Sequence, residues 1–336
     1  MPRLIGILIA LAMSLAGLPA VAADKTIIAH RGASGYLPEH TLEAKAMAHA
    51  MGAQFIEQDL VLTRDDVPIV LHDKHLDTVT NVAALFPDRA RDDGRFYAID
   101  FTLDEIRQLS VNERIDLTTG KPVFPSRFPT SLSSFKVPTL EEELELIAGL
   151  NRSTGRKAGI YPEIKAPAFH RAEGKDISRI VLDILAKRGY STIEDPIFLQ
   201  CFDFNETKRI RNELGYKGHL VQLIAENAWQ ESPDVDFDYL RTEAGLREVA
   251  KVADGIGPWL NHILDQDLNP TGLVEAAQGA GLAVHPYTLR ADALPPTASD
   301  HNTVLEAILF GAGADGVFTD FPDLAVNYLK ARGEDR

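Results

Sequence analysis

Residues 27–73 read IIAHRGASGYLPEHTLEAKAMAHAMGAQFIEQDLVLTRDDVPIVLHD, and two apolar runs in this stretch carry charged or titratable side chains. The first run predicts a buried strand that stops at His30, Arg31 and a glycine. The second run, residues 55–62, predicts another strand, and because side chains alternate along a strand, Glu57 and Asp59 must project from one face. Two such carboxylates repel each other and lose hydration on burial, so this pair requires a cation nearby.

The rest of the chain repeats a pattern of short strands separated by helices. Strands are predicted at residues 26–30, 55–62, 158–165, 196–201, 219–224, 255–259, 283–288 and 316–319. Helices are predicted at residues 42–51, 139–150, 176–188, 204–214, 242–252, 272–280, 301–310 and 322–330. Strands that alternate with helices imply a parallel sheet, and about eight of each close into a barrel. We therefore expect an α/β fold, a (β/α)8 TIM barrel.

Residues 74–137 interrupt this alternation. They contain many proline, glycine and aspartate residues, which favour turns and loops, around one short helical piece at residues 103–109. We interpret the segment as an insertion after the second strand. A connection of this length inside a compact domain is usually functional, here as a lid or a substrate wall. The alternatives are a folded decoration and the contact surface of a homodimer.

The first residues resemble a targeting segment. Arg3 precedes an apolar run at residues 4–18, and small residues at 20–23 offer a cleavage site, which is typical of a secretory signal peptide. The run is too short to favour a spanning helix, and a retained anchor is the alternative. We expect a signal peptide at residues 1–23 and a single domain at 24–336 that is exported to the periplasm, or secreted, without a stable membrane span.

Cysteine content and charge narrow the class of protein. The only cysteine is Cys201, which excludes an internal disulfide and a lipid-attachment cysteine at the cleavage site. A formal net charge of -15 argues against nucleic-acid binding, because phosphate backbones attract clustered lysine and arginine. The acidic balance is otherwise explained by solubility.

Five spaced motifs resemble the glycerophosphodiester phosphodiesterase family, in particular its secreted or periplasmic bacterial type. They are, in order, His30-Arg31-Gly32, Pro38-Glu39-His40-Thr41, Glu57-Gln58-Asp59, His72-Asp73 and Pro162-Glu163-Ile164-Lys165. The resemblance extends to the Phe318-Thr319-Asp320 segment. It implies an extra subdomain where the insertion lies. It also implies hydrolysis of deacylated phospholipids, such as glycerophosphocholine and glycerophosphoethanolamine, to sn-glycerol 3-phosphate and an alcohol.

Three acids are the candidate metal ligands. Catalytic groups of a TIM barrel come from the carboxyl ends of its strands, where Glu57, Asp59 and Glu163 fall. Carboxylates from two neighbouring strands suit a hard divalent cation, so Ca²⁺ is expected, with Mg²⁺ as the alternative. Charge pairing with Arg31 and Lys165 would explain the acids without a metal. The flanking histidines and the resemblance favour the metal.

Phosphodiester hydrolysis requires in-line attack at phosphorus, a neutralised phosphate and proton transfer to the leaving alkoxide. His72 follows residues 68–71, which we expect to continue the second strand. Imidazole titrates near neutral pH, so His30 and His72 are the candidate base and acid. The resemblance assigns His30 as proton acceptor and His72 as proton donor. Arg31 is the third catalytic candidate, because its fork of donors fits the phosphoryl oxygens.

Further substrate contacts are expected near the same strand ends. Besides Arg31, the candidates are Glu39, Lys165, Gln200, Trp259 and Phe318. Glu39 would orient Arg31 or a substrate hydroxyl, with helix capping nearby as the alternative. The two aromatic residues would form an apolar wall, although aromatic residues at such positions more often belong to the core.

Two other functions compete with hydrolysis of a small diester. The first is a phosphodiesterase for teichoic-acid-like polymers or phospholipids on the same barrel, which an open groove without the insertion would favour. The second is an exported binding protein with a vestigial site. The presence of all the motif residues that the chemistry needs counts against the second.

Overall fold

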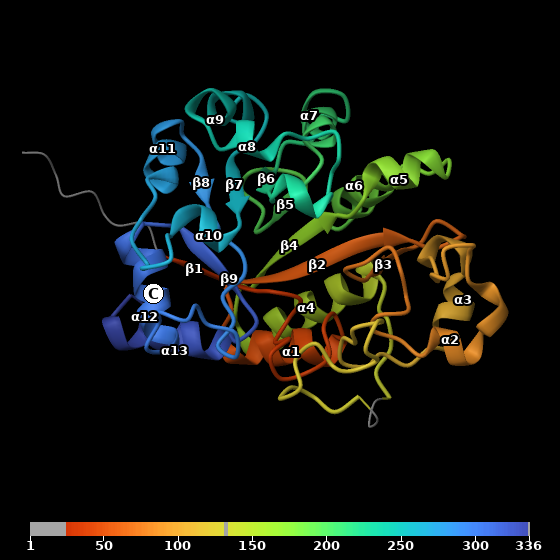
Figure 1. The fold of residues 1–336 in the computed structure, drawn as a ribbon. Helices are drawn as coiled ribbons and strands as arrows, with labels where there is room; N and C mark the ends of the chain where they lie inside the picture. The colour runs from red at the N-terminus through yellow and green to blue at the C-terminus, as the bar shows by residue number, and fades with distance from the viewer. Residues whose placement is uncertain (1–24, 131–133, 335–336) are drawn as a thin grey trace, which may run out of the picture.

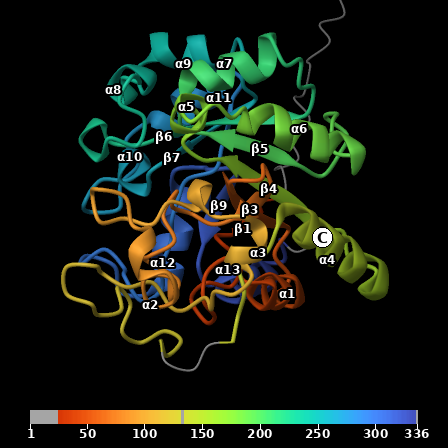
Figure 2. The ribbon, with the colours of Figure 1, turned by 90° about the vertical axis from the view of Figure 1, so that its right-hand side faces the viewer.

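The computed structural model describes residues 25–130 and 134–334. The predicted signal peptide, residues 1–23, lies outside these residues. Figures 1 and 2 show the strands at the centre of the molecule with the helices around them. The predicted TIM barrel is confirmed, with its insertion after the second strand.

The strands are β1 (Thr26–Ala29), β2 (Phe55–Leu62), β3 (Pro68–Val70), β4 (Gly159–Ile164), β5 (Phe198–Cys201), β6 (His219–Ile224), β7 (Gly255–Pro258), β8 (Ala283–Val284) and β9 (Gly316–Thr319). Their order in the sheet is β8-β7-β6-β5-β4-β2-β1-β9, and β3 pairs with β2 alone. All neighbours on this path are parallel. The N–H groups of Asp315 and Phe318 donate to the carbonyls of Val284 and Pro286 across 3.0 Å, which joins the last strand to the segment of β8 and closes the ring.

The helices are α1 (Leu42–Met51), α2 (Val82–Leu85), α3 (Leu103–Ile106), α4 (Leu140–Thr154), α5 (Pro167–Ala172), α6 (Ile177–Lys187), α7 (Phe204–Asn212), α8 (Phe237–Leu240), α9 (Glu243–Val249), α10 (Leu260–Ile263), α11 (Leu273–Gly279), α12 (His301–Glu306) and α13 (Pro322–Arg332). A π-helical turn (Ala307–Gly311) continues α12. Local sequence sets their ends. The hydroxyl of Thr139 caps the N-terminus of α4 in a reciprocal pair with Glu142, and Gly155 ends the helix in the left-handed region. No helix in the described part of the chain combines the length and the apolar character that a membrane crossing requires.

The core of the barrel is apolar and closely packed. Ile28, Tyr161, Val221 and Phe318 come from four different strands, are at most 1% exposed and contact one another inside the ring. Two larger clusters fill the space between the strands and the outer helices. The side chains of the functional candidates therefore stand at the carboxyl ends of the strands, on top of a filled interior.

One prediction about the second strand is wrong. Residues 68–71 were expected to continue β2, but β3 folds back and pairs antiparallel with it, with Leu60 opposite Val70. Thr63 starts the intervening turn, which passes through Asp66 at a φ of 63°. The reversal matters for function, because it brings the chain before His72 beside Asp59, whose carbonyl accepts from the N–H of Leu71 at 2.8 Å.

The insertion, residues 74–137, has a small core of its own that includes Leu76, Phe101 and Ile106, each fully buried. It contains α2 in addition to the predicted helical piece, which is shortened to α3. In Figure 1 these two helices lie beyond the arrowhead of β2 and beside β3. The insertion therefore extends from the end of the barrel where the strands terminate.

Candidate active site

A cavity of about 210 Å³ opens at the carboxyl ends of the strands. Most of the predicted site residues line it, namely His30, Arg31, Glu57, Asp59, His72, Glu163, Gln200, Trp259 and Phe318. Glu39 and Lys165 lie behind this lining and contact it through ion pairs. The structure thus brings together candidates from both ends of the sequence.

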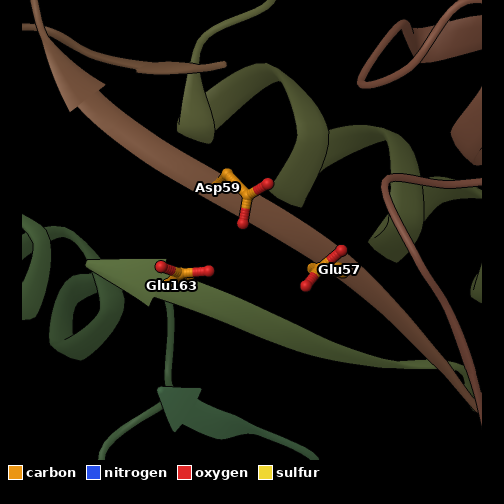
Figure 3. Close-up of side chains that lie close together, drawn as sticks. All are labelled: Glu57, Asp59 and Glu163. Atoms are coloured by element: carbon orange, nitrogen blue, oxygen red, sulfur yellow. The ribbon is translucent and has the colours of Figure 1, made fainter. Parts of the chain in front are cut away.

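Three carboxylates meet on one side of the cavity. Asp59 of β2 is directly opposite Glu163 of β4 in the parallel ladder, and Glu57 lies two residues earlier on β2. One oxygen of each lies within 4.8 Å of the others, and Figure 3 shows the three side chains turned toward a common point. All three are at most 4% exposed. This clustering follows from strand alternation on β2 and from the register of β4.

Burial makes this cluster electrostatically unstable without a cation. Burial, followed by the charge of Asp59, raises the pKa of Glu57 to about 8. Burial also raises the pKa of Glu163 well above its usual range, against the opposing ammonium group of Lys165. Burial opposes ionisation of Asp59 as well, but His40 lowers its pKa below the ordinary value. Ionising all three acids together requires more positive charge than the neighbouring side chains supply.

The donor set fits a hard divalent cation. Among the described residues, the Oδ1 atom of Asp59 is buried and has no hydrogen-bond partner. An orphaned carboxylate oxygen is costly in a low-dielectric site unless a ligand takes it. Oxygen ligands from three carboxylates suit Ca²⁺ or Mg²⁺. Glu57, Asp59 and Glu163 could therefore hold a metal ion.

A network behind Asp59 fixes the orientation of its carboxylate. The Nε2–H group of His40 lies 2.7 Å from Oδ2 of Asp59, and the ammonium group of Lys45 donates to Nδ1 of His40 at 3.1 Å. Lys45 is fully buried, donates also to the carbonyl of Glu57 and pairs with Glu143 at 3.2 Å. Burial and Lys45 lower the pKa of His40 to about 3, so this imidazole is neutral near pH 7. These contacts leave Oδ1 of Asp59 directed away from the protein's own donors.

The first histidine stands at the end of β1 against the last strand. Nδ1 of His30 lies 2.6 Å from Oδ1 of Asp320, which fixes the tautomer with the proton on Nδ1 and leaves Nε2 as an acceptor. Nε2 lies 3.5 Å from the hydroxyl of Thr288 and 3.9 Å from Glu57. Burial and the charge of Arg31 lower the pKa of His30 to about 4, against the opposing effect of Asp320. The imidazole of His30 is therefore neutral near pH 7, with Nε2 available to accept a proton.

The second histidine has the same arrangement. Nδ1 of His72 lies 2.6 Å from Oδ1 of Asp73, so its Nε2 is also free to face the cavity. Asp73 accepts in turn from Arg114 of the insertion at 2.6 Å. Burial and the charge of Arg31 lower the pKa of His72, against Asp73. An arriving phosphodiester anion would raise that pKa again and so favour the protonated form.

Arg31 is held between acids on both sides. Its backbone N–H donates to Glu57 at 2.8 Å, and its Nη1 donates to Glu39 at 3.0 Å. Its Nε lies 3.7 Å from Asp59 and is itself buried without a hydrogen-bond partner among the described residues. Glu39 also binds Arg114 through both carboxylate oxygens, at 2.9 Å and 2.5 Å. The guanidinium group is therefore fixed at the cavity with donor capacity left for an anion.

The remaining predicted residues divide into two groups. Lys165 pairs with Glu163 at 2.9 Å and with Glu231 at 3.0 Å, so part of the charge pairing considered as an alternative to a metal is present. Gln200 donates to Oε1 of Glu57 at 3.0 Å. Trp259 packs edge-on against Trp229 at 5.1 Å between ring centroids and forms the apolar wall with Phe318 and other aromatic residues.

The groups that orient His30, His72 and Asp59 are not indicated by any motif in the sequence. Asp73 and Asp320 belong to the motifs quoted above, but the motifs do not indicate that these carboxylates contact the imidazole rings. Asp320 is 290 residues from His30 and meets it when the barrel closes. A charged pair at buried helical positions, Lys45 and Glu143, was a signal that could have suggested the network behind Asp59.

A model of the glycerophosphoryl diester phosphodiesterase family matches residues 30–324, which include every predicted site residue. The chain belongs to this family. A glycerophosphodiester phosphodiesterase of Haemophilus influenzae is 48% identical over 328 residues, which are 91% of this chain and 90% of that protein. The chain is therefore an enzyme that hydrolyses glycerophosphodiesters.

Solved structures show the same fold. A Silicibacter pomeroyi protein, itself a candidate glycerophosphoryl diester phosphodiesterase, has a TM-score of 0.69 at 25% identity and covers 95% of this chain and 96% of its own. An Oleispira antarctica phosphodiesterase, solved in complex with the product sn-glycerol-3-phosphate, has a TM-score of 0.61 at 19% identity, with 91% and 96% covered. The second comparison supports the fold alone.

Proposed function

We propose that this enzyme cleaves small glycerophosphodiesters, such as glycerophosphocholine and glycerophosphoethanolamine, to sn-glycerol 3-phosphate and an alcohol. We propose further that the reaction depends on a divalent ion, Ca²⁺ in preference to Mg²⁺, held by Glu57, Asp59 and Glu163. The observation that carries the proposal is the arrangement of these acids beside two histidines whose Nδ1 atoms are each held by an aspartate.

The residues of the chain account for phosphate binding. A diester with its phosphate at the shared rim of His30, Arg31 and His72 would meet the guanidinium group of Arg31, which supplies donors for the non-bridging oxygens. A divalent ion bound to the three carboxylates would add Lewis-acid stabilisation of the phosphate and a template for a glycerol hydroxyl. Lys165 and Gln200 hold Glu163 and Glu57 in place for this role.

The two histidines account for proton transfer. His30 is neutral near pH 7 and has an acceptor at Nε2, so it would take the proton of the attacking hydroxyl or water. His72 would donate a proton from Nε2 to the leaving alkoxide. Asp320 and Asp73 stabilise the imidazolium that forms on each side, as carboxylates do for catalytic histidines in general.

The apolar half of the cavity supports a small substrate. Trp259, Phe318 and Tyr287 line the same cavity as the acids and would exclude water from the reacting group. The insertion stands at the same end of the barrel and forms a wall of the cavity that adjoins this one, which favours a small diester over a polymer.

We also propose that the enzyme is exported, to the periplasm in preference to the medium. The basis is the pattern of residues 1–23, which lie outside the described residues. Fractionation of cells that express the full chain, followed by N-terminal sequencing, would test this. A full-length N-terminus in the cytoplasmic fraction would contradict it.

Release of sn-glycerol 3-phosphate from glycerophosphocholine, measured with and without a chelator, tests the main proposal. Activity is expected to disappear on chelation and to return with added Ca²⁺. Activity that survives complete metal removal would contradict the metal site. Activity on a teichoic-acid-like polymer or on intact phospholipid, with none on small diesters, would favour the alternative substrates, and binding without turnover would favour an exported binding protein.

A further inference from the structure

A second cavity, of about 310 Å³, adjoins the active site on the side of the insertion. A single water needs only about 10–15 Å³ of such space, so a group of several non-hydrogen atoms fits. Glu113, Arg114, Val123, Phe124 and Arg127 of the insertion form one wall. This cavity has no role in the chemistry described above, and the inference drawn from it rests on the proposed function.

The two cavities share the residues that would hold the phosphate. His30, Arg31 and His72 line both of them, together with Arg290. The three carboxylates and the aromatic wall line the first cavity, so a diester bound at the shared rim would extend in two directions. If its glycerol lies on the side of the carboxylates, its second alcohol must enter the second cavity.

The arginines of the second cavity are already paired. Arg31 and Arg114 share Glu39, and Arg114 also binds Asp73. Arg127 and Arg290 share Asp320, at 2.7 Å and 2.9 Å.

Arg127 additionally binds Asp292 at 2.8 Å. Four guanidinium groups therefore meet four carboxylates in these pairs. These carboxylates neutralise the positive charge of the four arginines, and Glu113 is not one of them.

Glu113 also lines the second cavity and takes part in none of these ion pairs. It is 4% exposed and lines the cavity, and its Oε2 atom has no hydrogen-bond partner among the described residues. Burial and the charge of Glu39 raise its pKa to about 7, against the opposing charge of Arg127. A buried carboxylate oxygen without a donor is costly, and a ligand that brings a donor and a positive charge relieves that cost.

We propose that the second cavity receives the leaving alcohol of the diester and that Glu113 selects head groups with a primary ammonium group, such as ethanolamine. An ammonium group offers three N–H donors, one of which could satisfy the unpaired Oε2 atom of Glu113. A quaternary ammonium group offers none and is instead recognised by open aromatic faces. The face of Phe124 is occupied by the guanidinium group of Arg127, 3.7 Å from the ring centroid, so this wall favours the primary amine.

The test compares kcat/KM for glycerophosphoethanolamine, glycerophosphocholine and glycerophosphoglycerol, whose head group is neutral. The wild type is expected to prefer the ethanolamine diester. In Glu113→Gln the ratio of kcat/KM for the ethanolamine diester to that for the glycerol diester is expected to fall about tenfold or more, the usual effect of losing a charge-assisted hydrogen bond. The ratio for choline over glycerol should fall less.

Two controls separate this effect from others. Asp88→Asn removes an exposed acid of the same insertion outside the cavity, and it should leave the ratios unchanged. The melting temperature of Glu113→Gln identifies a folding defect, and the ratio remains informative for any fraction that folds. Unchanged ratios in Glu113→Gln, or an equal fall with Asp88→Asn, would overturn the head-group proposal and leave the proposed function standing. A wild type that cleaves none of the three diesters would instead overturn the proposed function.

Discussion

The two sides of the barrel mouth differ in chemistry although the same fold builds both. On the side of β1, β2 and β4, buried acids, histidines and an arginine form a network in which nearly every charge has a named partner. On the side of β5–β9 the cavity lining consists of Phe202, Leu223, Trp229, Trp259, Tyr287 and Phe318, with Gln200, Thr288 and Arg290 as its polar members. We infer that the residues of the first side perform the reaction. The residues of the second side shape the cavity and exclude water from it.

Buried charged residues are found on the side of the barrel mouth that holds the acids. Glu143, Lys45 and His40 form a chain behind Asp59, and each is at most 2% exposed. Such groups are retained where they orient a functional side chain, because they stabilise a fold less than well-packed apolar residues do. The apolar side needs no comparable support.

The largest expected effect comes from the acids. Glu163→Gln should lower turnover about 10³-fold, because the loss of one carboxylate would weaken binding of the proposed divalent ion. Calcium titration of the variant by calorimetry should show weaker binding than the wild type. Equal calcium affinity in the two proteins would remove Glu163 from the site.

The histidines rank next. His30→Ala and His72→Ala should each lower kcat about 10²-fold or more, because each removes one proton transfer. His49→Ala is the matched control, since His49 contacts Asn151 at 3.0 Å away from the cavity. Near-normal kcat in either catalytic variant, with an unchanged melting temperature, would exclude that histidine from the mechanism.

A smaller effect is expected from the aspartate behind His30. Asp320→Asn should lower kcat about 10-fold to 10²-fold, because the ring loses the partner that fixes its tautomer. The pKa of Asp320 lies below its usual range even though burial opposes ionisation, since Arg290, His30 and Arg127 stabilise the carboxylate. Its contribution to stability is therefore present above the unfolded-state pKa and is lost as the pH falls.

Stability measurements check the sign of that contribution. At pH 7 the free energy of unfolding of Asp320→Asn should be about 3 kcal/mol below that of the wild type, the usual effect of breaking a buried ion pair. The gap should narrow below about pH 4, where the unfolded carboxyl is protonated. A constant gap across this range would contradict the assignment.

The smallest effect is expected on the apolar side. Trp259→Ala should raise KM about tenfold while kcat changes little, because it removes contact area that substrate and transition state share. Trp259→Phe, which keeps an aromatic ring, should fall between the wild type and the alanine variant. A loss of kcat as large as that of His30→Ala would show that this wall participates in the reaction and would remove the distinction between the two sides.

The sequence predicted the barrel because all eight strands of the ring are short apolar runs with helical patterns between most of them. It predicted the acids because Glu57 and Asp59 alternate on one strand, and Glu163 falls at the end of the next strand of the barrel. It did not predict the reversal at β3, because the turn after Thr63 separates two apolar runs that also suit one long strand. That reversal is what brings His72 to the acids.

Contacts between distant segments were beyond sequence reasoning for a different reason. Asp320 meets His30, and Arg114 meets Glu39, when the barrel closes and the insertion folds over its mouth. The sequence of the insertion has no periodic pattern that predicts a binding site. The cavity lined by Glu113 is therefore recognised only in the folded structure. Local patterns determine elements, and tertiary contacts determine which polar side chains are left unpaired.

A crystal structure of the protein with Ca²⁺ and sn-glycerol 3-phosphate tests the account most directly. It should show the ion bound by Glu57, Asp59 and Glu163, with phosphorus between the Nε2 atoms of His30 and His72 and its oxygens against Arg31. An ion bound elsewhere, or a phosphate that only one of the two rings can reach, would contradict it.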